Sequence, residues 1–185
     1  MTTPTTYPNA SAAASAGSPL GKALAAEHAA VYAYGVVGAQ TTGTLRKRAA
    51  TGFDAHRARR DQLRALLVKR GEAPAEPAPT YPLPFEVASP ADAIRLAVLV
   101  EDGVTAAYLE LAADPDLSLR RLAALAMQES AVRSYTWRPV VVAFPGMPVE
   151  RATGPDPVRT EPTPIPPVVD TPAAQSPISQ QLQDQ

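Results

Sequence analysis

Residues 72–89, which read EAPAEPAPTYPLPFEVAS, decide how this chain folds. The segment carries five prolines and separates two long blocks, residues 20–73 and 91–137, in which proline is nearly absent. Proline lacks a backbone N–H and clashes with the preceding turn, so it is excluded from helix interiors. The two blocks are therefore where long helices can form, and the proline-rich segment is the connection between them.

Start and stop signals divide each block into two helices. Ser18-Pro19 and Ser89-Pro90 each supply an N-cap serine followed by proline at the first helical position. Gly43 interrupts the first block, Thr44 can cap the helix after it, and Asp114-Pro115 divides the second block. The sequence predicts an all-α protein with helices over residues 19–42, 45–70, 90–112 and 115–137.

The connection is too long to be a simple loop. Its 18 residues would reach about 55 Å in polyproline II conformation, whereas each predicted helix is only about 35–39 Å long. The connection can therefore run the length of a bundle and reverse the direction of the second hairpin. We expect a four-helix bundle of two antiparallel hairpins joined by one long crossover.

Apolar residues recur at helical spacing and predict the core faces. The stripe of helix 90–112 is Ile94, Ala97, Val98, Val104, Tyr108 and Leu111. The stripe of helix 115–137 is Leu119, Leu122, Leu125, Val132 and Thr136. Glycines at 35, 52 and 103 lie inside helices, where each costs about 1 kcal/mol relative to alanine. We expect these glycines to allow close helix approach.

One ionisable residue interrupts the apolar stripe of each predicted helix: Glu27, His56, Glu101 and Glu129. Counted from the hairpin loops, the four lie within about 3–5 Å of one height along the bundle. Three carboxylates and one imidazole suit iron or manganese. The chain has no cysteine, so thiolate metal sites are excluded. One interpretation is a protein that binds a single iron or manganese ion.

A metal-free ion network is the interpretation that we favour. Arg60 follows His56 by one turn and Arg133 follows Glu129 by one turn, so both can offset the buried carboxylates. His28 is adjacent to Glu27 and points about 100° away from it, which predicts a surface or flank position. Helical aromatic residues are expected to pack in the core or to hydrogen-bond to the carboxylates: Tyr32, Tyr34, Tyr108, Tyr135 and Trp137.

Three stretches carry a family resemblance: residues 27–35 (EHAAVYAYG), 56–61 (HRARRD) and 101–103 (EDG). They resemble a group of actinobacterial ferritin-like domains of unknown function, over about residues 19–140. The resemblance implies a ferritin-like four-helix bundle. Its superfamily holds two iron ions with one Glu on each of two helices and Glu-x-x-His on each of the others. Here Phe53 replaces the second Glu and Val132 replaces the second His, so two of six ligands are missing.

These departures favour a non-enzymatic scaffold or interaction protein with a degenerate metal site. They leave no catalytic residue to assign. A protein partner of unknown identity is expected, and a homodimer is possible. Nucleic acid is a further alternative, because helix 45–70 carries nine basic residues against two acidic ones. We consider nucleic acid the weaker interpretation, because the acidic helix 90–112 can neutralise this charge within the bundle.

The ends of the chain differ from its centre in composition. Residues 1–18 have no basic residue and no strongly apolar run, which argues against a secretory signal. Residues 141–185 are rich in proline and poor in aromatic residues. We expect a disordered arm over 1–18, a bundle over 19–140 and a disordered tail over 141–185.

A net charge of −1 predicts no attraction to an anionic membrane, and a cytoplasmic location is the expectation.

Overall fold

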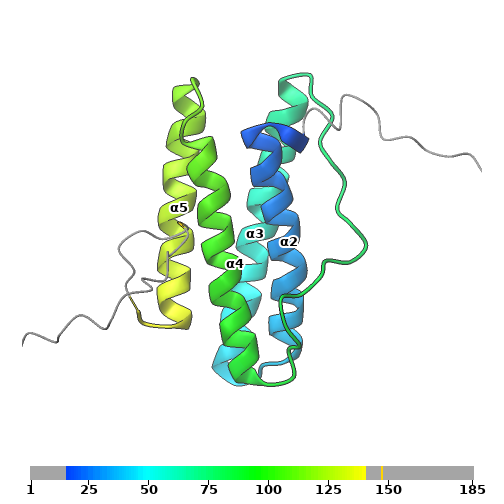
Figure 1. Ribbon diagram of the computed structural model, residues 1–185, viewed down its shortest axis with the longest axis vertical. Helices are drawn as coiled ribbons and strands as arrows, with labels where there is room; N and C mark the ends of the chain where they lie inside the picture. Colours follow the sequence, from blue (N-terminus) through cyan, green and yellow to red (C-terminus); the bar gives the residue numbers. More distant parts are fainter. Residues whose placement is uncertain (1–15, 141–146, 148–185) are drawn as a thin grey trace, which may run out of the picture. The chain divides into compact units, whose positions relative to one another are not determined.

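The computed structural model of the chain describes residues 16–140 and 147. The predicted arm and tail fall almost entirely outside these residues. The described part is all-α, and its four long helices form a bundle (Figure 1). These helices are α2 (Pro19–Ala39), α3 (Gly43–Lys69), α4 (Pro90–Leu111) and α5 (Leu117–Trp137).

The helix caps agree with the sequence at α2 and α4 and differ at α3 and α5. Ser18 and Ser89 accept hydrogen bonds from the backbone N–H groups of Gly21 and Asp92, so both predicted caps are confirmed. The N-cap of α3 is Thr42, and Gly43 is already its first residue, so the predicted cap at Thr44 is wrong. The N-cap of α5 is Asp116, whose side chain accepts from the N–H of Ser118. This helix therefore begins two residues later than predicted.

The long connection reverses the second hairpin, as its length predicted. In Figure 1, α2 runs from top to bottom and α3 returns to the top. Residues 70–89 then descend along the outside of the bundle, so α4 starts at the bottom and runs parallel to α3. Along the described chain, α2 packs against α3 and α4, and α4 packs against α5.

Several contacts fix the crossover against the helices. The buried His28 donates a hydrogen bond from Nε2 to the Ala75 carbonyl oxygen at 3.2 Å. The rings of Tyr32 and Tyr81 lie 5.5 Å apart, and Val87 enters the core. The prediction of a surface position for His28 is therefore wrong. The connection covers that side of α2, which the spacing of His28 alone could not indicate.

The buried face of α5 differs from the predicted stripe by about one residue. Its buried residues are Leu119, Ala123, Ala126, Ser130 and Trp137. Leu125 and Val132, predicted to face the core, are 47% and 57% exposed. Neighbouring helical residues are about 100° apart, so a shift of one position turns the predicted stripe toward solvent. By contrast, the α4 stripe is confirmed at Ala97, Val98, Val104, Tyr108 and Leu111.

Gly52 is the glycine at which helices approach closely. A Cβ atom built there would lie 2.2 Å from Cε1 of Tyr34, so α2 places an aromatic ring directly against the α3 backbone. At Gly35 and Gly103 an added Cβ would meet nothing within 4 Å. The prediction of close approach is confirmed at Gly52 and wrong at the other two positions.

Of the described helices, none is long and apolar enough to cross a membrane.

Candidate functional site

Three helices bring polar side chains together in the middle of the bundle. Glu27 of α2, His56 of α3 and Glu101 of α4 are each no more than 1% exposed. The sequence predicted that four such residues converge at one height, and the structure brings these three of them together. Such groups are costly to bury unless they satisfy one another. The geometry shows how they do so.

His56 bridges the two carboxylates. Its Nδ1 lies 2.7 Å from Oε2 of Glu27, and its Nε2 lies 3.2 Å from Oε1 of Glu101. An ionised carboxylate oxygen only accepts hydrogen bonds, so both ring nitrogens must donate. His56 is then an imidazolium cation held between two anions.

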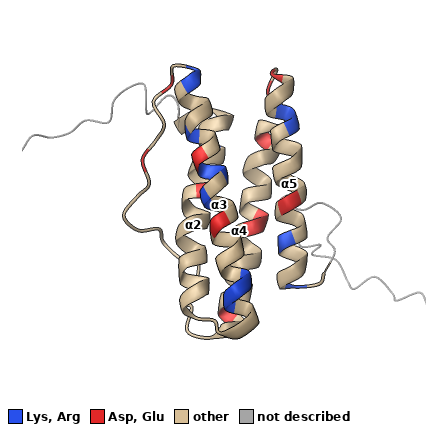
Figure 2. Ribbon diagram, turned by 180° about the vertical axis from the view of Figure 1, so that it is seen from behind, with Lys and Arg blue, Asp and Glu red and all other residues tan. Residues whose placement is uncertain are grey.

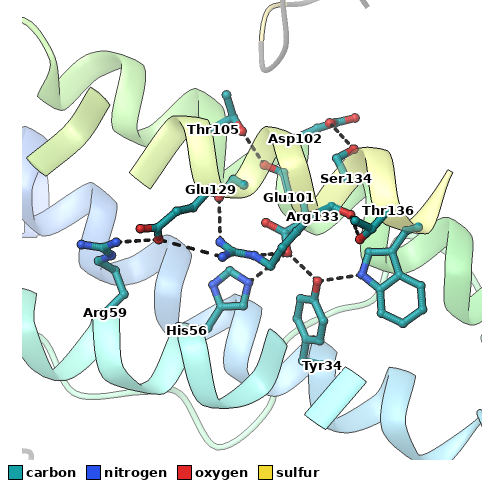
Figure 3. Close-up of polar contacts among 12 residues, drawn as sticks. Tyr34, His56, Arg59, Glu101, Asp102, Thr105, Glu129, Arg133, Ser134 and Thr136 are labelled. Carbon is teal, nitrogen blue, oxygen red and sulfur yellow. Dashed lines mark hydrogen bonds and ion pairs between the residues drawn. The ribbon is translucent and has the colours of Figure 1, made fainter. Parts of the chain in front are cut away.

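Glu101 of α4 accepts hydrogen bonds from the three other helices at a single oxygen. Its Oε1 accepts from Tyr34 at 2.5 Å, from Arg133 Nε at 2.9 Å and from His56 (Figure 3). The Tyr34 hydroxyl in turn accepts from Trp137 Nε1 at 2.9 Å. The other carboxylate oxygen of Glu101, Oε2, is buried and forms no hydrogen bond with any described residue. The carboxylate is therefore oriented through Oε1 alone.

Glu27 is held in the same manner from the opposite side. Tyr108 of α4 donates a hydrogen bond from its hydroxyl group to Oε1 of Glu27 at 2.7 Å. Oε2 of Glu27 accepts the hydrogen bond from Nδ1 of His56. The expectation that helical tyrosines bond to the buried carboxylates is confirmed for Tyr34 and Tyr108. Two carboxylates, one imidazolium and one guanidinium make a cluster without net charge. We call Glu27, Tyr34, His56, Glu101, Tyr108 and Arg133 the core network.

The pKa shifts agree with these assignments. Burial is the largest influence on His56 and opposes its charged form, but hydrogen bonds to Glu101 and Glu27 outweigh it and raise its pKa. Burial likewise opposes the Glu101 anion, yet His56 and Arg133 hold the pKa of Glu101 below its ordinary value. Burial and the neighbouring carboxylates raise the pKa of Tyr34 and Tyr108, which therefore remain protonated donors.

Glu129 does not join this cluster. Its side chain is 51% exposed and pairs with Arg59 of α3 at 2.7 Å, at the rim of the bundle (Figure 3). Arg133 links it weakly to the core, with Nη1 4.0 Å from the Glu129 carboxylate. The position facing inward is Ser130, which is fully buried. The prediction of Glu129 in the core seam is wrong because the buried face of α5 lies one residue further along.

Arg60 does not offset the buried carboxylates either. It pairs with its neighbour Asp61 at 2.8 Å. Arg133, the second predicted partner, does reach Glu101. Sequence reasoning missed Arg59 as the partner of Glu129. No sequence signal marks this pair, because a half-exposed carboxylate can be satisfied by water.

The residues as arranged do not fit a metal ion. A histidine ligand needs a free lone pair, and both nitrogens of His56 are already directed at carboxylate oxygens. Val132, at the position expected for a second histidine, points toward solvent. Within the part of the chain that the structure describes, no three His, Asp or Glu side chains are grouped to hold a metal.

The arginines of α3 are engaged within the protein. Figure 2 shows the basic residues of α3, with acidic residues lying among them. Arg64 pairs with Glu76, Arg70 with Asp114 and Asp116, and Arg57 with Asp54. These pairs spread the positive charge of α3 over intramolecular partners, which weakens the case for a phosphate-binding stripe.

Comparison with known proteins places the chain in a family. The model of a domain of unknown function (DUF4439) matches residues 19–149. The chain belongs to this family. A crystal structure of a conserved hypothetical protein, rv2844, from Mycobacterium tuberculosis shares 34% identity with this DUF4439 chain, with a TM-score of 0.64. The match covers 73% of this chain and 100% of the mycobacterial one. No curated protein matches the chain.

The family match spans the whole four-helix bundle, including every residue of the core network. The matching structure independently supports the four-helix architecture, because its full length aligns with this chain. Neither match assigns a biochemical activity.

Proposed function

We propose that this DUF4439 domain is a non-enzymatic helical scaffold of ferritin-like descent. In this proposal, the core network occupies the place where a metal-binding relative would hold its ions. One observation carries the proposal: both nitrogens of the buried His56 are hydrogen-bonded to carboxylates from two other helices. With both nitrogens engaged, His56 has no lone pair to offer a metal ion, and Oε2 of Glu101 is the one buried side-chain oxygen among the described residues that is left without a partner.

The Arg133 guanidinium completes this substitution. It reaches Glu101 from α5, one of the two helices on which the metal-binding pattern is broken. A guanidinium carries a permanent charge and several donors, so it can neutralise a buried carboxylate with no exchangeable ion. Removal of one partner from a buried ion pair typically costs about 3–5 kcal/mol. The network therefore makes the relative placement of the helices specific.

Metal analysis of the untagged full chain tests this proposal. We expect no stoichiometric iron or manganese in the purified protein, and no rise in melting temperature when excess Fe²⁺ or Mn²⁺ is added. A bound ion would raise the melting temperature by mass action. Stoichiometric metal that is lost in Glu101→Ala, but retained in the surface variant Glu110→Ala, would overturn the proposal.

A further inference from the structure

Between its buried ends at Leu119 and Trp137, helix α5 presents large apolar residues to solvent and small ones to the core. Leu125 and Val132 are 47% and 57% exposed, whereas Ala123 and Ala126 are almost completely buried. Burial of a leucine side chain is worth about 1.5–3 kcal/mol more than its exposure. Burial of Leu125 and Val132 against a partner would therefore be favourable, which makes the outer face of α5 a candidate contact surface.

This face borders an open groove. The helix pairs that pack along their lengths include α2 with α3 and α4 with α5, but not α3 with α5. A depression of about 320 Å³ between them is lined by Gln62 and Leu66 of α3 and by Arg121, Leu122 and Leu125 of α5. A second depression, of about 420 Å³, continues along α5 past Leu125 to Val132. Leu125 lines both, so it marks the middle of the groove.

Two of the charged residues along this groove, Arg121 and Glu129, are placed symmetrically about Leu125 on α5, and two more, Arg59 and Arg133, line it beside Glu129. Arg121 lies four residues before Leu125 and Glu129 four residues after it, and both line the groove. Arg121 is exposed and has no polar partner among the described residues, while Glu129 is half-exposed and uses only Oε2 in its pair with Arg59. One turn of helix thus separates the central leucine from a cation on one side and an anion on the other.

We propose that the occupant of this groove is a second copy of the chain, with α5 packed antiparallel to α5 of the partner copy about a two-fold axis at Leu125. The two-fold operation places each Arg121 at the height of Glu129 of the partner copy, so two ion pairs form at once. With helix axes about 8–10 Å apart, these long side chains can meet across the seam. Such an interface is isologous and closes as a dimer.

The same register buries the apolar residues. Leu125 meets its own symmetry mate, and Leu122 and Val132 of both copies extend the seam on each side. The partner's α5 would also contact Leu66 of α3, which already lines the depression. This proposal concerns only the outer face of α5. Its test is separate from that of the core network, because self-association is measured on the outer face and metal binding in the core.

Disulfide trapping tests the register directly. The chain has no cysteine, so Leu125→Cys introduces one thiol per copy, next to the proposed axis. We expect Leu125→Cys to form a covalent dimer under mild oxidation, because residues on the axis satisfy the short Cβ separation that a disulfide requires. Leu99→Cys is the matched control on α4, since Leu99 is 46% exposed. It is expected to remain uncrosslinked.

Charge complementation provides a second test that does not depend on a disulfide. Arg121→Glu and Glu129→Arg each place like charges together in a homodimer, and each is expected to weaken self-association about tenfold or more. When mixed, the two variants restore both ion pairs and should form a heterodimer. Sedimentation velocity of the full chain reads out each state, and thermal unfolding verifies that each variant is folded.

The outcomes separate clearly. A wild-type mass of twice 19.4 kDa, with Leu125→Cys trapped and the mixed variants associating, supports the proposal. A monomer at all concentrations, or a dimer that is trapped equally by Leu99→Cys, would overturn it. Either result leaves the metal analysis of the core unaffected, so failure of this proposal is distinguishable from failure of the proposed function.

Discussion

Helices α4 and α5 form one hairpin but differ in the size of the side chains in the middle of their buried faces. The buried face of α4 carries large residues, including Val98, Val104 and Tyr108, and the apolar stripe in its sequence identifies that face correctly. The buried face of α5 carries Leu119 and Trp137 near its ends but only Ala123, Ala126 and Ser130 between them, where Leu125 and Val132 lie outside. Apolar periodicity therefore locates the core only where large residues are reserved for it.

This difference determines the candidate site. On α4 the stripe places Glu101 correctly in the core, whereas on α5 it places Glu129 there wrongly. Small residues at 123, 126 and 130 let α5 lie close to α4, and Arg133 then reaches Glu101. Substitutions on α5 and on α4 test this contrast separately.

The largest expected effect comes from aspartate substitutions at adjacent positions of α5. Ala126→Asp would bury an unpaired carboxylate, because Ala126 is 3% exposed, and we expect it to cost about 4 kcal/mol or more. Leu125→Asp, one residue away, should cost less than about 1 kcal/mol in the monomer. Urea denaturation at low protein concentration measures both. Equal losses, or a greater loss at Leu125, would show that the described α5 face is wrong.

Glu101→Gln tests the α4 side of the comparison. The amide preserves shape but removes the negative charge between His56 and Arg133, and it leaves both cations without their shared partner. We expect a loss of about 3–5 kcal/mol in the free energy of unfolding. The control is Glu110→Gln on the same helix, which breaks an exposed pair with Lys22 and should cost less than about 1 kcal/mol. A near-neutral Glu101→Gln would contradict the network.

Alanine substitutions at two helical glycines should have opposite signs. Gly52→Ala would drive a methyl group into the Tyr34 ring, 2.2 Å away, and overpacking of this kind costs about 1–3 kcal/mol. Gly103→Ala meets nothing within 4 Å and should stabilise the protein by up to about 1 kcal/mol through helix propensity. Thermal unfolding of the two variants gives the comparison. Stabilisation by Gly52→Ala would refute the close approach of α2 and α3.

The smallest effect is a pH dependence of stability. The pKa of His56 is raised from its ordinary 6.5, so its contribution is complete below about pH 6.5 and is lost as pH rises through the folded-state pKa. The pKa of Glu101 is lowered, so its contribution is lost on the acid side, below its ordinary 4.5. The stability difference between wild type and His56→Gln should therefore shrink between pH 6 and pH 9. A difference that grows with pH would contradict the assigned charges.

The sequence alone reaches much of this structure. Proline placement predicts four helices and the crossover, since proline is excluded from helix interiors regardless of tertiary context. Interrupted stripes identify Glu27, His56 and Glu101. The errors on α5 share one physical cause: periodicity cannot choose between two faces about 100° apart when one carries leucine and the other alanine. The burial of His28 was missed because it depends on where a long connection docks.

The protonation state of His56 tests the central claim most directly. The structure places both ring nitrogens against carboxylate oxygens, at 2.7 and 3.2 Å. ¹⁵N NMR of imidazole-labelled full chain at pH 7, with His56→Gln used for assignment, reports whether each nitrogen carries a proton. We predict that both Nδ1 and Nε2 of His56 are protonated, and that excess Mn²⁺ leaves the stability of the protein unchanged. A neutral imidazole with one bare nitrogen, or a nitrogen bound to stoichiometric metal, would contradict the account.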